Sequence, residues 1–222
     1  MNFKEFIEVD REQTNIEKFE GSFLDYLEIL KDNPDIPKLA HKRIYEMIAD
    51  KGVEELKPDE NPRIKKIHGH DVIRKYGFFK NDFYGIDKVI MKIVSYFKSA
   101  AMKGEEARQV LYLVGPVGAG KSSIVESLKI ALEDCEGTYA LKGCPMHEEP
   151  LHLIPKHLRP KFEEILGVKI EGDLCPACKY KLTHEFKGIY EDFPVEKVGF
   201  SIRSRKGIGV VPPVDPNNQD TS

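Results

Sequence analysis

Near the middle of the chain the sequence reads Gly115-Pro116-Val117-Gly118-Ala119-Gly120-Lys121-Ser122. It matches the pattern G-x-x-x-x-G-K-[ST], which is typical of the phosphate-binding loop of nucleoside triphosphatases. The alternative is a glycine-rich turn that carries a lysine by accident. The flanking sequence favours the first interpretation, because residues 110–114 form an apolar run typical of a buried parallel strand and residues 123–132 repeat apolar side chains at helical spacing. The chain is therefore predicted to hold a nucleotide at a strand–loop–helix unit.

Each residue type in this loop has a physical role toward phosphate. Glycines at positions 115, 118 and 120 permit backbone angles that other residues avoid and let main-chain N–H groups approach the anion. The helix that begins near Lys121 directs the positive end of its dipole at the phosphates. We expect the Lys121 ammonium to reach the β- and γ-phosphates and the Ser122 hydroxyl to ligate Mg²⁺.

The composition gives no sign of a membrane or nucleic-acid protein. The 222 residues can form one large or two small domains, and 34 Lys and Arg against 37 Asp and Glu leave a net charge of -3. No apolar run approaches the ~20 residues that span a bilayer, and the first residues lack the segments of a signal peptide. We therefore expect a cytoplasmic protein without a membrane partner.

Residues 1–80 are predicted to form a helical region followed by a linker. Ser22 and Asp25 have the spacing of a capping pattern ahead of an apolar run, and prolines separate this helix from a second one at residues 39–48. We expect the two helices to pack on each other. Residues 57–70 contain prolines and basic side chains and are interpreted as the linker.

Residues 81–135 are predicted to be the first part of the nucleotide-binding core. Tyr84, Gly85 and Ile86 form an aromatic-glycine turn before an amphipathic stretch at residues 89–102. This turn is well placed to cover a nucleotide base. Aromatic side chains before a helix also serve as packing contacts in the core, so both interpretations stay open.

Residues 136–200 are predicted to be an insertion with little regular sheet. It contains two short-spaced pairs, Cys144 with His147 and Cys175 with Cys178, which together match a tetrahedral Cys₃His site for structural Zn²⁺. The alternatives are a redox-active C-x-x-C and unrelated buried thiols.

Two further expectations concern the remaining cysteine and histidines. Cys135 is left over and is expected to be a small core residue. The fourth zinc ligand could instead be one of three nearby histidines, His152, His157 or His184.

No apolar strand ending in Asp or Asp-Glu follows residue 132, although hydrolysis at such a loop needs one to hold Mg²⁺ and orient water. The catalytic residues are therefore unknown. Residues 201–222 are rich in proline and polar side chains and are predicted to be a solvated coil. On these two grounds we expect an N-terminal fragment of a longer protein.

Several segments, in this order, resemble the bacterial PrkA family of serine protein kinases with an AAA-type ATPase core: residues 81–86, 110–122, 144–151 and 201–205. The resemblance implies an α/β P-loop NTPase core that is incomplete in this chain. It places ATP at Gly115 to Ser123, and adenine is the preferred base on the resemblance alone. For the whole protein it implies transfer of the γ-phosphate of ATP to serine or threonine of a protein substrate.

Three classes of function remain open. The first is the kinase, and the second is an ATP-driven remodelling ATPase that assembles as a ring of identical subunits. Phosphate-binding loops of this type are the hallmark of motors, whereas common protein kinases use a different glycine-rich loop. The third is a zinc-stabilised docking module for a protein or nucleic acid. The basic run at residues 203–206 lacks an aromatic platform, which disfavours specific nucleic-acid binding.

Overall fold

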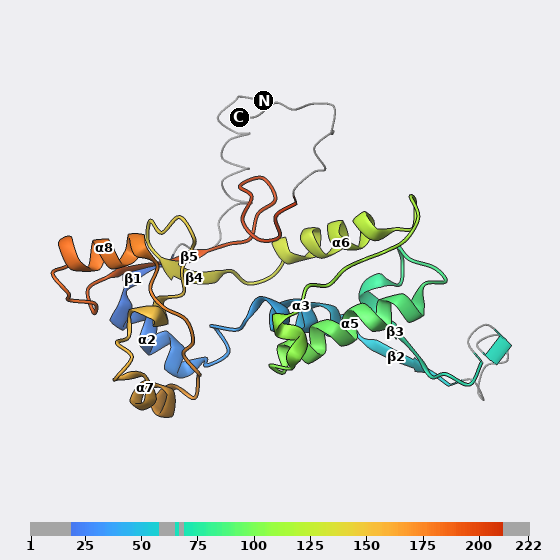
Figure 1. Cartoon of the computed structure of the whole chain (residues 1–222), viewed down its shortest axis with the longest axis horizontal. Helices are drawn as coiled ribbons and strands as arrows, with labels where there is room; N and C mark the ends of the chain where they lie inside the picture. Colours follow the sequence, from blue (N-terminus) through green and yellow to red (C-terminus); the bar gives the residue numbers. More distant parts are fainter. Residues whose placement is uncertain (1–18, 58–64, 67–68, 211–222) are drawn as a thin grey trace, which may run out of the picture.

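The computed structural model of the chain describes residues 19–57, 65–66 and 69–210. Two groups of elements lie side by side along the long axis of the molecule (Figure 1), one around a three-stranded sheet and one around three helices. In chain order the elements are β1 Glu20–Ser22, α2 Phe23–Asp32, α3 Ala40–Ala49, β2 Val53–Leu56, β3 Ile73–Tyr76, η1 Gly77–Phe79, α5 Asp87–Ala101, η2 Glu105–Arg108, α6 Lys121–Glu133, β4 Thr138–Leu141, η3 Pro150–Leu153, α7 Arg159–Leu166, α8 Pro176–His184 and β5 Pro194–Val198.

The first group is built on an antiparallel sheet of order β1-β5-β4. Glu20 lies opposite Glu196, and Thr138 lies opposite Val198. Helices α2, α7 and α8 surround this sheet in Figure 1. Its buried side chains, which we call the sheet core, are Phe23, Tyr26, Leu30, Tyr139, Leu141, Cys144, Leu151, Leu153, Ile154, Leu166, Ile170, Cys178, Phe193 and Val195.

The second group packs α3, α5 and α6 together with the hairpin β2-β3. These helices bury one apolar face each, as their spacing of apolar residues requires. Their buried side chains, together with one from η1, form what we call the helical core: Met47, Ile48, Phe79, Ile90, Ile93, Val94, Ile124, Leu128 and Leu132.

The helices follow the sequence predictions closely. α3, α5 and α6 each begin and end within two residues of the predicted bounds. The predicted cap of α2 is a complete capping box, since Ser22 Oγ accepts from the Asp25 N–H at 3.2 Å and Asp25 Oδ2 accepts from the Ser22 N–H at 2.7 Å. These local signals are confirmed.

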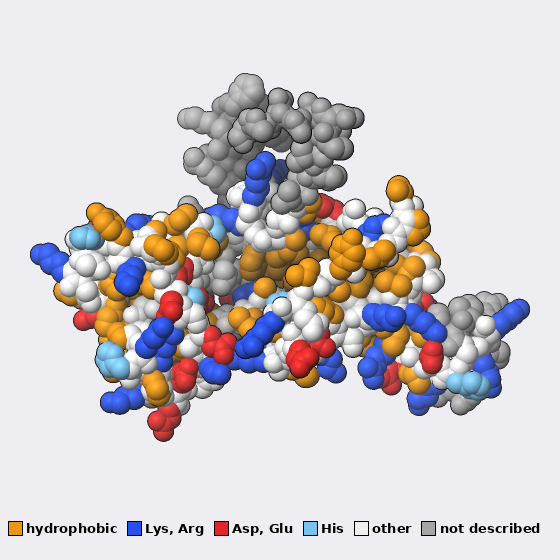
Figure 2. All heavy atoms as spheres, viewed as in Figure 1, with side chains coloured by type: hydrophobic (Ala, Val, Ile, Leu, Met, Phe, Trp, Pro, Cys, Tyr) orange, Lys and Arg blue, Asp and Glu red, His pale blue; other side chains and the backbone are white. Residues whose placement is uncertain are grey.

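The predicted strand at residues 110–114 is wrong for this structure. The segment forms no strand and pairs with no strand of the described residues. Val110, Tyr112 and Val114 are each 82% or more exposed. A parallel strand is stabilised by strands at its edges and by layers on both faces, and no strand in the described part of the chain lies beside this run. Figure 2 shows hydrophobic side chains gathered between α5 and α6, where the segment passes.

The expectation that the first two helices pack on each other is also wrong. Phe23, Tyr26 and Leu30 of α2 enter the sheet core, whereas Met47 and Ile48 of α3 enter the helical core. Each helix buries its apolar face in a different core, so the predicted helical region is divided between the two cores.

The structure also contains more sheet than the sequence predicted. Strands β4 and β5 lie within residues 136–200 and pair with each other, although the sequence predicted neither of them. Both strands are short, which agrees with the expectation of little regular sheet in this segment. Their pairing joins segments more than 50 residues apart, which no local pattern reveals. The hairpin β2-β3 flanks the predicted linker, of which residues 58–64 and 67–68 lie outside the described residues.

The end of the chain is described only in part. Residues 201–210 carry one isolated bridge between Ser201 and Lys206, and residues 211–222 of the predicted coil lie outside the described residues. In the portion that the structure describes, no helix combines the length and the apolar character needed to cross a bilayer.

Candidate nucleotide site and cysteine cluster

The glycine-rich loop leads directly into the first turn of α6. Gly118 and Gly120 have φ angles of 81° and 78°, the left-handed region that a side chain would strain. Gly120 is the N-cap of α6 and supplies no side-chain hydrogen bond to the first turn. The loop residues 115–119 are exposed. The N-terminus of a 13-residue helix therefore opens to solvent at the predicted phosphate position.

Lys121 folds back over its own loop. Its Nζ donates to the carbonyl oxygens of Gly115 and Pro116, both at 2.7 Å. Ser122 and Ser123 follow in the first turn of α6 and are exposed. The ammonium is thus held beside the loop by two neutral acceptors, and a phosphate oxygen would be a stronger acceptor for it.

The aromatic-glycine turn meets the loop through a residue that sequence reasoning passed over. The Phe83 ring lies 3.6 Å from the position that a Cβ on Gly120 would occupy. Tyr84 is 81% exposed, and its hydroxyl donates to the Asn81 carbonyl at 3.2 Å. The position of Phe83 directly before Tyr84 and Gly85 in the sequence is the feature that could have identified it as a neighbour of the loop.

The other residues of this turn lie near the hairpin β2-β3 or at the start of α5. Tyr84 and Gly85 help to line a groove of about 880 Å³ together with residues of β2 and β3. Ile86 is the N-cap of α5 and packs against the helical core. The structure therefore brings the turn close to the loop through Phe83, and it places Tyr84 and Gly85 along the groove.

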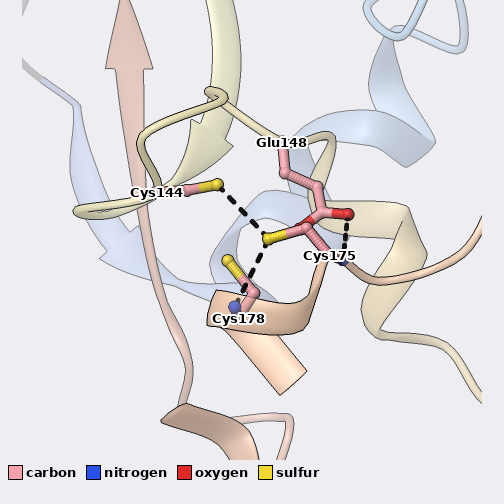
Figure 3. A group of neighbouring side chains, drawn as sticks. All are labelled: Cys144, Glu148, Cys175 and Cys178. Carbon is pink, nitrogen blue, oxygen red and sulfur yellow. Dashed lines mark hydrogen bonds between the residues drawn. The ribbon is translucent and has the colours of Figure 1, made fainter. Parts of the chain in front are cut away.

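A second cluster joins the three cysteines that the sequence predicted with an unexpected carboxylate. One ligand atom from each of Cys144, Glu148, Cys175 and Cys178 lies within 4.8 Å of the others. The sulfur atoms point toward one another (Figure 3), from the turn after β4 and from the start of α8. Cys175 is the N-cap of α8, and its Sγ accepts from the Cys178 N–H at 3.4 Å.

His147 does not join this cluster. It is exposed, and its φ of 48° belongs to a turn in which its N–H donates to the Cys144 carbonyl at 3.2 Å. The next residue, Glu148, is turned inward instead and is 8% exposed. Because His147 is exposed and Glu148 is buried, the glutamate, rather than the predicted histidine, joins the three cysteines.

The other three histidines differ in their relation to the cluster. His157 and His184 are exposed and are not among the clustered residues. His152 Nδ1 lies 3.2 Å from Glu148 Oε1, and its Nε2 lies 2.8 Å from the Glu171 carbonyl oxygen. His152 therefore contacts the clustered carboxylate rather than the sulfurs.

Burial and hydrogen bonds act differently on the clustered groups. Burial raises the pKa of the Cys175 and Cys178 thiols. At Cys144 burial acts in the same direction, but hydrogen bonds from the backbone of Glu148 and Met146 and from the thiols of Cys178 and Cys175 together hold the pKa below its usual value. Cys135 packs against the helical core, as expected, and burial raises the pKa of its thiol.

The sequence of the chain is similar to that of known AAA-type proteins. The chain matches the family model described as PrkA AAA domain over residues 21–222. It is 42% identical over 226 aligned residues to a protein named ATP-dependent protease PrkA from Bacillus subtilis, covering 99% of this chain and 34% of that protein. It is 37% identical over 170 residues to a protein named serine/threonine kinase YeaG from Escherichia coli K12, covering 73% of this chain and 26% of that protein.

A weaker similarity extends to another kind of protein. The chain is 33% identical over 75 residues to a Lon protease from Methanosphaera stadtmanae, which covers 34% of this chain and 8% of that protein. No solved structure matches the chain significantly. The chain spans only about a third of the length of the PrkA relative and about a quarter of that of the YeaG relative. Because the family model covers both the loop and the cysteine cluster, the chain belongs to the family of PrkA AAA domains.

Proposed function

We propose that the chain binds Mg-ATP through residues 115–123, as the nucleotide-binding part of an AAA-type ATPase. The observation that carries this proposal is the glycine loop that opens onto the uncapped N-terminus of α6. Phosphate oxygens would accept from the loop amides, and Lys121 would exchange its two carbonyl acceptors for them. The exposed Ser122 hydroxyl is available as the Mg²⁺ ligand.

The adenine base is proposed to lie near residues 84–86. The support is the contact of the Phe83 ring with the position beside Gly120, which brings this turn next to the loop. An aromatic face next to a phosphate-binding loop offers a stacking surface of about the size of a base. The exposed ring of Tyr84 can contribute to that surface.

The whole protein is proposed to use ATP for mechanical work on a protein substrate. This loop type is the one that motors and switches use, whereas common protein kinases cover ATP with a different glycine-rich loop. One relative is named an ATP-dependent protease, and the Lon similarity points the same way. Such a motor would assemble as a ring of identical subunits.

A second candidate is a serine/threonine protein kinase. The name of the YeaG relatives favours it. In that case the γ-phosphate of the bound ATP would pass to a serine or threonine hydroxyl of a protein substrate. In the described residues no strand ends in an acidic pair, so the residues that would act on the γ-phosphate are not assigned for either candidate.

Calorimetry with Mg-ATP tests the binding site. Lys121→Ala is expected to weaken ATP binding about 10- to 100-fold, because it removes charged hydrogen bonds to phosphate worth about 1.5–3 kcal/mol. Lys129→Ala, on the same helix but paired with Glu126, is the matched control and should bind as the parent protein does. Equal ATP affinity in Lys121→Ala and in the parent protein would remove Lys121 from the site. GTP titrated alongside reports whether the base is discriminated.

A separate assay distinguishes the two candidate activities. The complete protein is incubated with γ-labelled ATP and casein, an unfolded probe that serves both as kinase substrate and as protease substrate. Label on casein serine supports the kinase. Free phosphate with ATP-dependent assembly, with or without casein fragments, supports the motor.

A further inference from the structure

The cysteine cluster lies in the sheet core and does not contain residues of the phosphate-binding loop. Its members come from two segments of the chain. Cys144 and Glu148 flank the turn after β4, and Cys175 and Cys178 open α8. The four side chains converge on one point between these segments (Figure 3).

The spacing of the sulfur atoms is that of a tetrahedral zinc site. A zinc–sulfur distance of about 2.3 Å places two sulfur ligands about 3.8 Å apart across a tetrahedron. The Sγ atoms of Cys144 and Cys175 lie 3.8 Å apart, and the four ligand atoms all lie within 4.8 Å of one another. A single ion therefore fits at the centre with small adjustments of the side chains.

Glu148 gives a second, independent reason to place a cation here. Its side chain is 6% exposed, and its Oε1 accepts from the Cys175 N–H at 2.7 Å and faces His152. Its Oε2 is buried and has no hydrogen-bond partner. A buried carboxylate oxygen needs a donor or a metal, and zinc accepts carboxylate oxygen beside cysteine sulfur.

The alternatives explain less of this arrangement. A disulfide has a sulfur–sulfur distance of about 2.05 Å and would use only two of the three sulfurs. It would also leave the buried Glu148 Oε2 without a partner. A redox-active C-x-x-C pair needs neither Cys144 nor the carboxylate. Structural zinc takes four ligands in a closed tetrahedral set rich in thiolate, and a carboxylate oxygen can serve as the fourth ligand.

We propose that Cys144, Glu148, Cys175 and Cys178 bind one Zn²⁺, and that His147 takes no part. The ion ties the turn after β4 to the start of α8. His152 acts as a positioning residue, because its ring lies between the Glu148 carboxylate and the Glu171 carbonyl oxygen and contacts both. The metal therefore stabilises the sheet core and is separate from the Mg²⁺ that accompanies ATP.

Metal content and matched variants test this proposal. Protein purified without chelator is expected to contain one zinc per chain by elemental analysis. Zinc affinity is then measured by competition with a chromophoric chelator. Glu148→Gln keeps the shape of the side chain but loses the charge, and we expect it to bind zinc at least about tenfold more weakly. His147→Gln is the matched control at the neighbouring position and should bind zinc as the parent protein does.

Cobalt substitution identifies the ligands. Co²⁺ should give the thiolate charge-transfer and tetrahedral ligand-field bands, and Cys178→Ser should reduce the charge-transfer band. If Cys178→Ser does not fold, the comparison of Glu148→Gln with His147→Gln still decides. Weaker zinc binding in His147→Gln together with unchanged binding in Glu148→Gln would overturn the ligand set. Absence of zinc with no uptake of Co²⁺, or a mass lower by two hydrogens that a reductant restores, would overturn the metal site.

Discussion

The carboxylate of Glu149, the residue after the clustered Glu148, accepts a short hydrogen bond from a tyrosine of α2. Tyr26 Oη donates to Glu149 Oε1 at 2.6 Å, and the Leu151 N–H approaches the same oxygen at 3.4 Å. Burial raises the pKa of Glu149, and these hydrogen bonds act against that effect. Tyr26 itself is fully buried in the sheet core. One hydroxyl therefore joins α2 to the segment that carries the cluster.

Tyr26→Phe tests this contact. The change removes the hydroxyl and leaves the ring, so Glu149 keeps only the longer hydrogen bond from Leu151 and the protein should lose about 1–3 kcal/mol of stability. Urea unfolding measures the loss as a lower midpoint with an unchanged slope. Tyr180→Phe is the control, because Tyr180 is 63% exposed. Equal midpoints for Tyr26→Phe and the parent protein would contradict the predicted loss.

At the level of residues, the sequence predicts the cluster only in part. The spacing of Cys144, Cys175 and Cys178 correctly indicated that they meet. The choice between His147 and Glu148 depends on one backbone angle in a turn, and the sequence pattern favours histidine because histidine is the commoner zinc ligand. The unpaired oxygen of Glu148 appears only when the neighbours are placed.

Among the elements, α2 depends on its cap. The reciprocal hydrogen bonds of Ser22 and Asp25 satisfy two N–H groups at its start. We expect Ser22→Ala to cost about 1 kcal/mol, within the range for lost caps. Thermal unfolding measures the effect against Ser95→Ala, an exposed serine inside α5 where alanine is the better helix former. A Ser22→Ala protein as stable as Ser95→Ala would show that α2 is fixed by packing alone.

The same cap predicts a dependence on pH. The backbone hydrogen bond from Ser22 holds the pKa of Asp25 below its usual value. A carboxylate with a lowered pKa stabilises the folded state above its ordinary pKa of about 3.9, and the contribution is lost as the pH falls through the lower folded value. Ser22→Ala keeps this backbone bond but loses the second one, which the Ser22 hydroxyl donates to Asp25 Oδ2 at 2.7 Å. The part of the stability difference between Ser22→Ala and the parent protein that comes from the hydroxyl bond should therefore be lost in strong acid, and unfolding curves at two pH values measure it.

The elements that were missed share a physical cause. Helices are found from the sequence because their hydrogen bonds are local. β2 is largely exposed, and both strands carry charged side chains. Their cross-strand pairs of Glu54 with Lys75 and Glu55 with Arg74 form only when the hairpin does. Residues 110–114 have the composition of a strand but lack a partner in the described residues.

At the level of the molecule, two cores meet through few contacts. α6 leads into β4, and Arg43 of α3 reaches across, with Nη1 donating to the Glu136 carbonyl at 2.9 Å and its guanidinium lying 5.2 Å from the Phe200 ring centroid. The chain returns from β5 to the helical core through Phe200. The cores are thus joined by a narrow connection and each has its own apolar interior.

Removal of zinc is expected to loosen one core only. Chelation should speed hydrogen exchange at β4 and α8, which flank the cluster, and should leave α5 and α6 unchanged. Mass spectrometry of peptides from both cores measures this difference. Faster exchange in both cores would mean that they unfold as one cooperative unit, and no change in either would argue that the metal does not hold the sheet core.

The uncovered run at residues 110–114 also has a practical consequence. It reads Val-Leu-Tyr-Leu-Val, without a charge or a proline to discourage pairing with another copy. Val110, Leu111, Tyr112 and Val114 are exposed next to the phosphate-binding loop, whereas Leu113 packs against the helical core. We therefore expect this exposed apolar run, more than the net charge of -3, to limit the concentration at which the protein remains free of aggregates.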